Sequence, residues 1–317
     1  MSSAPSSLPN GAWPVLLTPF TESRSIDWAC LDQLVDYYLA AGVAGLFSVC
    51  LSSEMYQLSE AERVQLATHI VKRVGGRIPV IGSAVAGADV DAQIHAVKTI
   101  AATGLTAVVL LPCLMAREDE GAAVWQGRLE AIVAGTEGIA LGFYECPRPY
   151  KRAVPVESIR WAASTGRFVF HKDTSHQLDS VVAKIAASRG SLLKVYTTQM
   201  STLIPTLEAG GHGFSSYGAN LYPELVQWIC ENFSKDPVKA LELQRLVAIA
   251  EYCINGKYPA SAKVFVRENT GVPMGSLCRG TYDALSVHDT LPLIDLSRYV
   301  KALSLPVKIV TRAGHHA

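Results

Sequence analysis

The sequence has no excess of charge of either sign. Its 28 lysine and arginine residues equal its 28 aspartate and glutamate residues, so the formal net charge is zero. A nucleic-acid-binding surface needs a basic stripe, often with aromatic residues interleaved, and neither pattern is present. The sequence therefore predicts no nucleic-acid partner.

Paired cysteines and long apolar runs are also missing. The seven cysteines are scattered without a CxxC pair, which argues against a zinc site and a disulfide framework and favours a cytoplasmic protein. The longest apolar run, residues 105–115, is too short to span a membrane. Residues 1–10 lack the basic and apolar regions of a signal peptide. We expect a cytoplasmic chain without a membrane partner, which begins with a flexible arm over residues 1–10.

Apolar residues are abundant, at 49% of the chain, and they recur in strand–helix units. Short, continuously apolar runs, which are typical of buried parallel strands, alternate with segments of helical periodicity. We predict strands in the following runs: 14–20, 45–50, 79–85, 107–112, 139–144, 168–172, 192–196 and 213–217.

Eight such units predict an α/β fold, a (β/α)8 TIM barrel, over residues 11–234. Further helical patterns predict additional C-terminal helices, an extension over residues 235–317 that packs on the barrel. An open doubly wound sheet is the alternative architecture. It is disfavoured because no GxGxxG follows the first strand.

Two side chains at predicted strand ends suggest covalent chemistry. Lys172 ends one apolar run, where burial lowers the pKa of an amine and a neutral amine attacks carbonyl groups. Tyr144 ends the preceding run and offers a phenol for proton transfer. The carboxyl ends of barrel strands meet at one face, so both groups are expected together, as in a class I aldolase. The alternative is that Lys172 merely closes a strand and extends into solvent.

Four motifs then appear in the order and spacing of a known family. They are Thr18-Pro19-Phe20, Cys50-Leu51-Ser52-Ser53-Glu54, Tyr144-Glu145-Cys146-Pro147 and Lys172-Asp173-Thr174-Ser175. A Gly-rich segment at 210–213 and Asn220 add to the match. Over about residues 11–304 the chain resembles the dihydrodipicolinate synthase / N-acetylneuraminate lyase family of Schiff-base TIM-barrel lyases.

The resemblance implies specific roles. Lys172 would form a Schiff base with pyruvate or another 2-oxo acid, and Tyr144 would relay protons to and from the substrate oxygen. Ser52 and Ser53 would hold the substrate carboxylate. No cofactor beyond the covalent lysine Schiff base and no metal would be required, and the chain would form a homotetramer or homodimer.

Four positions depart from the family pattern. Leu51 and Leu114 replace a hydroxyl residue and a tyrosine, Pro149 stands where the synthases have an arginine, and Glu145 replaces an asparagine. These changes make dihydrodipicolinate synthesis doubtful and leave a lyase, aldolase or dehydratase acting on a 2-oxo acid. Glu145 is either a general base close to the substrate or the partner of a nearby cation such as Arg148.

Other residues have two interpretations each. Thr198 and Ser215 are candidate contacts for substrate hydroxyls, or they only satisfy backbone groups. Tyr217 either lines the pocket or packs in the barrel. His171 is expected to point away from Lys172, to the opposite face of its strand. The alternative function, motivated by the lost hydroxyl and tyrosine, is a non-catalytic protein that binds a 2-oxo acid or sugar acid on the same barrel.

Overall fold

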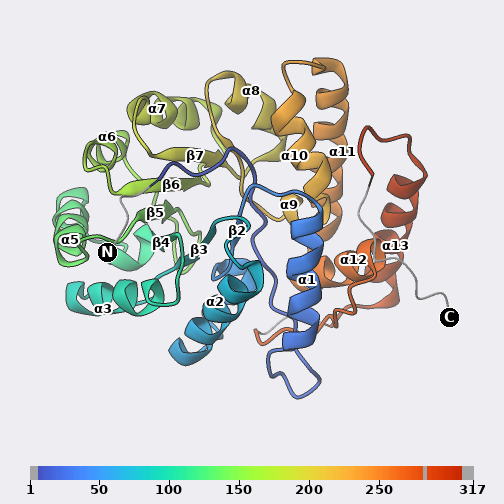
Figure 1. The fold of residues 1–317 in the computed structure, drawn as a ribbon, viewed down its shortest axis with the longest axis horizontal. Coiled ribbons are helices and arrows are strands. Elements are labelled where there is room, and N and C mark those ends of the chain that lie inside the picture. Colours follow the sequence, from blue (N-terminus) through green and yellow to red (C-terminus); the bar gives the residue numbers. More distant parts are fainter. Residues whose placement is uncertain (1–5, 281–283, 309–317) are drawn as a thin grey trace.

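The computed structural model describes residues 6–280 and 284–308, and its centre is a ring of parallel strands (Figure 1). Neighbouring strands follow the order β1-β8-β7-β6-β5-β4-β3-β2. The ring closes where Phe47 donates its N–H to the oxygen of Pro14 (3.0 Å) and Leu16 donates to the oxygen of Phe47 (3.0 Å). The strands are β1 (Gly11–Ala12), β2 (Leu46–Phe47), β3 (Val80–Ser83), β4 (Ala107–Leu110), β5 (Leu141–Tyr144), β6 (Phe168–Asp173), β7 (Lys194–Thr197) and β8 (Gly213–Phe214).

Helices follow the strands along the chain and form the outer layer. Those of the barrel are α1 (Trp28–Ala40), α2 (Glu60–Val74), α3 (Val90–Ala101), α4 (Pro112–Met115), α5 (Ala122–Gly135), α6 (Val156–Ser164), α7 (Leu178–Ser188), α8 (Leu203–Glu208), α9 (Gly218–Leu221) and α10 (Pro223–Asn232). Two short 3-10 turns are η1 (Leu51–Ser53) and η2 (Met200–Thr202). The predicted (β/α)8 TIM barrel is confirmed.

The two ends of the barrel sequence differ from the expected strands. The run 14–20 was expected as a strand, but only Gly11–Ala12 pair regularly, and Val15 adds one isolated bridge to Phe47. Two prolines in that run, Pro14 and Pro19, have no N–H to donate to a ladder. At the other end β8 covers only Gly213–Phe214 of the expected run 213–217, and α9 begins four residues after it.

Local sequence signals explain several helix boundaries. Ser59 accepts a hydrogen bond from the N–H of Glu62, and the Glu62 carboxylate accepts from the N–H of Ser59. This reciprocal capping box satisfies backbone N–H groups at the start of α2. Gly75 ends the helix with φ of 58°, a left-handed conformation that glycine adopts without steric cost.

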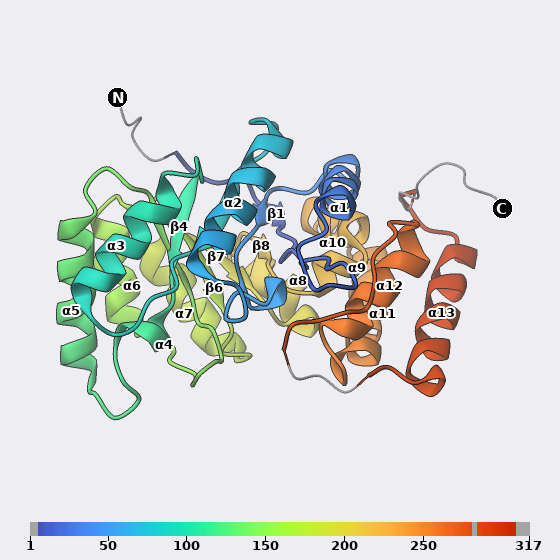
Figure 2. The same cartoon turned by 90° about the horizontal axis from the view of Figure 1, so that it is seen from below.

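The C-terminal part of the chain adds three helices at one side of the barrel, shown in orange and red in Figure 2. They are α11 (Pro237–Asn255), α12 (Ala260–Thr270) and α13 (Val287–Ala302). A fully buried ion pair ties α12 to the loop after β2, because the Lys263 ammonium lies 2.8 Å from the Glu54 carboxylate. The extension is therefore joined to the end of the barrel at which catalytic groups gather in this fold.

Part of the predicted N-terminal arm packs against the barrel. Leu8 is buried, and the oxygen of Pro9 accepts a hydrogen bond from the Tyr196 hydroxyl (2.8 Å). Residues 1–5 of the arm and residues 309–317 of the predicted extension lie outside the described residues.

Candidate active site

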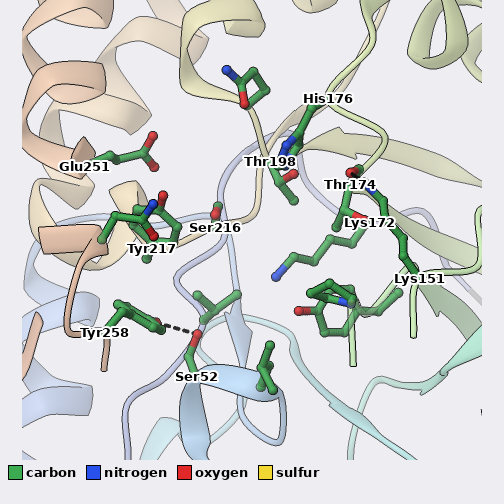
Figure 3. A pocket seen from close by; sticks show the side chains of 16 residues that line it. Ser52, Lys151, Lys172, Thr174, His176, Thr198, Ser216, Tyr217, Glu251 and Tyr258 are labelled. Carbon is green, nitrogen blue, oxygen red and sulfur yellow. Dashed lines mark hydrogen bonds between the residues drawn. The ribbon is translucent and has the colours of Figure 1, made fainter. Parts of the chain in front are cut away.

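A cavity of about 290 Å³ opens at the carboxyl ends of the strands (Figure 3). Its walls come from the ends of β5 and β6, from the loops that follow β2, β7 and β8, and from α11 with the segment after it. The size approaches the lower end of ordinary small-molecule sites. Catalytic sites of this fold occupy the same face, so the cavity is the candidate active site.

Lys172 reaches the middle of this cavity from β6 (Figure 3). Tyr144 is its register partner on β5. The Lys172 ammonium nitrogen lies 4.1 Å from the centre of the Tyr144 ring. Two neighbouring parallel strands therefore hold an amine and a phenol side by side, as the sequence predicts.

Burial shapes the chemistry of both groups. It lowers the pKa of Lys172 from 10.5 to about 8, although the nearby Cys50 and Cys146 thiols act in the opposite direction. Burial also raises the pKa of Tyr144 well above 10.0, and Cys146 and Cys50 add to the shift. At slightly alkaline pH the site thus combines a nucleophilic neutral amine with a phenol that keeps its proton.

The two serines after β2 are placed differently. Ser52 lines the cavity, and its hydroxyl accepts a hydrogen bond from the Tyr258 hydroxyl (2.5 Å). Ser53 is fully buried and does not line the cavity, because its hydroxyl is bonded to the backbone N–H (2.8 Å) and oxygen (2.7 Å) of Cys50. Leu51 lines the cavity with an apolar side chain.

Of the remaining predicted contacts, Thr198 and Tyr217 line the cavity and Ser215 does not. The Thr198 hydroxyl donates its hydrogen to the oxygen of Asp173 (2.9 Å), which leaves only its lone pairs for a ligand. Ser215 is fully buried, and its hydroxyl has no hydrogen-bond partner among the described residues. The adjacent Ser216 occupies the cavity wall instead.

Glu145 lies outside the cavity, in a buried charged group between the sheet and α7. Its carboxylate is 2.6 Å from the Lys184 ammonium, which is also 2.5 Å from the Asp173 carboxylate. The sequence suggested a nearby cation such as Arg148 as the partner, but the partner comes from α7. Glu145 also accepts hydrogen bonds from the N–H groups of Val154 (2.8 Å) and Thr174 (3.0 Å).

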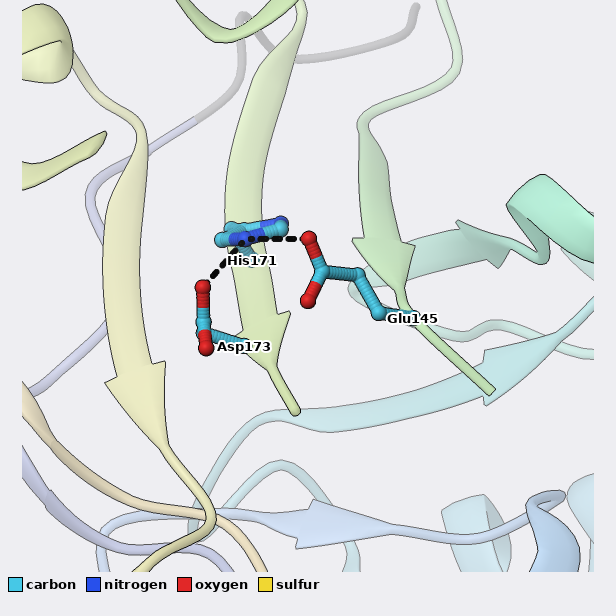
Figure 4. A group of neighbouring side chains, drawn as sticks. All are labelled: Glu145, His171 and Asp173. Carbon is cyan, nitrogen blue, oxygen red and sulfur yellow. Dashed lines mark ion pairs between the residues drawn. The ribbon is translucent and has the colours of Figure 1, made fainter. Parts of the chain in front are cut away.

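His171 belongs to the same buried group (Figure 4), on the face of β6 away from the cavity. Its Nε2 atom lies 3.6 Å from Glu145 and 3.7 Å from Asp173. These three side chains have the donor types of a metal site and gather within 4.8 Å of one another. The Lys184 ammonium contacts both carboxylates, so it supplies the positive charge that a metal ion would bring.

Several residues that line the cavity were not predicted from the sequence. Glu251 and Asn255 come from α11, and Tyr258 follows that helix, although the extension was expected only to pack on the barrel. Lys151 and His176 come from the loops after β5 and β6. Strand-end patterns mark neither helix residues such as Glu251 nor loop residues such as His176, so these positions require the tertiary structure.

The fold and the site together place the protein in one structural class. It is a (β/α)8 barrel whose cavity holds a buried amine, a candidate nucleophile, beside a phenol. The chain belongs to the dihydrodipicolinate synthetase family, whose model matches residues 8–292. Enzymes of this family use no cofactor and form a lysine Schiff base with pyruvate.

Individual proteins resemble the chain in sequence or in fold. The chain is 28% identical to 4-hydroxy-tetrahydrodipicolinate synthase of Bacillus subtilis over 83% of this chain and 89% of that protein. YagE, a prophage protein of the same family from E. coli K12 solved with pyruvate, has a TM-score of 0.82 at 19% identity, covering 92% and 98% of the two chains. CdNal from Clostridium difficile, solved with mannosamine, has a TM-score of 0.81 at 16% identity with the same coverage.

No helix in the described ranges combines the length and the apolar character needed to cross a membrane.

Proposed function

We propose that this protein is a class I lyase or aldolase that forms a Schiff base between Lys172 and pyruvate or another 2-oxo acid. The observation that carries the proposal is the buried Lys172 amine in the cavity, with a lowered pKa and the Tyr144 ring 4.1 Å away. Family membership and the pyruvate complex of YagE support the choice of substrate. The expected homodimer or homotetramer and the cytoplasmic location stay predictions.

In the proposed reaction the neutral Lys172 amine attacks the 2-oxo carbon. One proton of the amine and one proton from Tyr144 move to the departing oxygen, which leaves as water. The resulting iminium withdraws electrons, so the neighbouring carbon gives a proton to the Tyr144 phenolate, which restores the phenol and leaves an enamine. That enamine carbon forms a bond to an aldehyde, or the reverse step breaks one. Glu145 is a supporting group in this proposal, because Lys184 and two backbone N–H groups hold it outside the cavity.

Borohydride trapping with pyruvate tests the Schiff base directly. Wild-type protein is expected to gain the mass of pyruvate less water plus two hydrogens, on the peptide that contains Lys172. Lys172→Ala should gain none, whereas Lys98→Ala, which removes an exposed lysine of α3, should trap like wild type. Absence of an adduct with pyruvate and with every other 2-oxo acid tried would contradict the proposal.

A second experiment, proton exchange on pyruvate, separates an enzyme from a binding protein. An aldolase should also exchange the methyl protons of pyruvate with solvent deuterium, because the enamine forms and collapses repeatedly. Trapping of pyruvate without exchange or turnover would favour the non-catalytic alternative.

The pH dependence of this exchange should follow the amine. Because the pKa of Lys172 is lowered to about 8, the neutral form increases about tenfold per pH unit below that value and levels off above it. The second-order rate constant for exchange reports on the free enzyme and is expected to rise and then plateau near pH 8. A rate that keeps rising towards pH 10 would show an ordinary, solvated lysine.

A further inference from the structure

We propose that Glu251 of α11 determines substrate specificity by binding a hydroxyl group on the distal part of a 2-oxo acid. The inference rests on the proposed function, because it places the 2-oxo end of the substrate on Lys172. It assigns a binding role to a residue of the C-terminal extension, which the sequence indicated only as packing.

Glu251 stands on the side of the cavity opposite Lys151 and Thr174, and the Lys172 amine projects between these two sides (Figure 3). Its side chain is buried, with only 8% of the residue exposed. One carboxyl oxygen accepts a hydrogen bond from the N–H of Gly218 (2.8 Å). Among the described residues no cation forms an ion pair with it.

The backbone is shaped to receive this carboxyl group. A Cβ atom added to Gly218 would lie 2.3 Å from the Glu251 oxygen, so any larger residue at 218 would displace the carboxyl group. The glycine allows the start of α9 to approach α11 closely. The carboxyl group is thus fixed at one oxygen by a backbone donor, within a cavity wall.

The chemistry of this wall suits neutral polar groups. Burial raises the pKa of Glu251 to about 8, so at neutral pH the group is largely protonated and both donates and accepts hydrogen bonds. Its neighbours in the cavity include the neutral Tyr217, Asn255 and Ser216. A hydroxyl matches such groups in both directions, whereas an apolar chain would leave them unpaired.

A negatively charged group of a ligand would bind more favourably on the opposite side of the cavity, because the Lys151 ammonium is there. Lys151 lines the cavity and donates a hydrogen bond to the oxygen of Thr174. The substrate class that fits both Lys172 and Glu251 is therefore a 2-oxo acid with a hydroxylated carbon chain. Leaving a buried polar group unpaired is expected to lower the affinity by about fivefold to about 150-fold.

The test compares three ligands by the concentration that gives half-maximal borohydride trapping: pyruvate, 2-oxohexanoate, and a six-carbon 2-oxo-3-deoxy acid with hydroxyls on its distal carbons. Wild type should prefer the hydroxylated acid over 2-oxohexanoate by about tenfold or more. Glu251→Leu should lose most of that preference. Glu251→Gln should keep it, since an amide also donates and accepts.

Pyruvate reports whether the Schiff-base site is intact, because it has no distal chain and should be trapped equally in all variants. Gly218→Ala displaces the Glu251 carboxyl group without changing its chemistry, so this variant should also lose the preference for the hydroxylated acid. It tests the inference if Glu251→Leu does not fold. Equal affinity of wild type for both six-carbon acids, or full preference in Glu251→Leu or Gly218→Ala, overturns the inference while pyruvate trapping persists. Failure of wild type to trap any 2-oxo acid overturns the proposed function itself, and this inference with it.

Discussion

Replacing Lys184 with methionine is expected to lower the free energy of unfolding by about 3–5 kcal/mol, the usual cost of leaving buried charges without their partner. The Lys184 ammonium lies 2.6 Å from the Glu145 carboxylate and 2.5 Å from the Asp173 carboxylate, and all three residues are buried. Methionine fills similar space but supplies no charge, so two carboxylates would face each other in the interior.

The pKa values of Lys184 and Asp173 show that their charged neighbours outweigh the effect of burial. Burial by itself would lower the pKa of Lys184, but the two carboxylates outweigh burial and raise it. Burial would raise the pKa of Asp173, but the His171 ring and Lys184 outweigh it and hold that pKa below its ordinary value. The Lys184 ammonium and the Asp173 carboxylate therefore stay ionised together near neutral pH.

Urea denaturation followed by circular dichroism measures the loss. Lys72→Met, which removes an exposed lysine of α2, is the matched control and should unfold like wild type. Adding Glu145→Gln and Asp173→Asn to Lys184→Met should recover much of the stability, because the uncompensated charges are gone. A Lys184→Met variant as stable as wild type would mean that the buried group contributes nothing to the fold.

The sequence predicts which side chains share a face of the sheet, but it does not predict the ion pairs of this buried group. Alternation of side chains along a strand separates Lys172 from its neighbours His171 and Asp173, and separates Tyr144 from Glu145. The strand pattern and the barrel were therefore enough to predict that Lys172 and Tyr144 share one face. The partner of Glu145 was not predictable in the same way, because Lys184 lies 39 residues further on and reaches the group only through the packing of α7 on the sheet.

The direction of side chains in loops was even less predictable from the sequence. The motif around Ser52 and Ser53 gives both the same expected role, but a 3-10 turn sends one hydroxyl towards the cavity and the other into its own backbone. The role of Glu251 in the cavity wall was not predictable for another reason. Helix α11 reaches the cavity only because the C-terminal helices pack beside the barrel (Figure 2). Side-chain direction in loops and helix placement both depend on tertiary packing, which local patterns do not encode.

Replacing Lys172 with methionine is expected to raise the free energy of unfolding by about 3 kcal/mol at neutral pH while it abolishes the pyruvate adduct. The pKa of Lys172 falls from 10.5, the ordinary value for a lysine amine, to about 8 in the folded protein. At about 1.36 kcal/mol for each unit of pKa, the difference between these two values gives a cost of about 3 kcal/mol for holding a charged amine in this cavity. Methionine fills similar space without a charge, so the variant avoids that cost.

The sign of the pH dependence identifies the cause. Because the folded pKa lies below the unfolded pKa, the unfolded chain binds more protons between about pH 8 and about pH 10.5, and wild-type stability gains from rising pH there. The advantage of Lys172→Met should therefore be full below pH 8 and shrink above it. Denaturation of both proteins at about pH 7 and about pH 9.5 measures this change, with Lys98→Met as an exposed control. A Lys172→Met variant that is less stable than wild type at pH 7 would show that the amine is well solvated. It would also remove the physical reason for a nucleophile at this position, since a destabilising buried charge is kept where it serves chemistry.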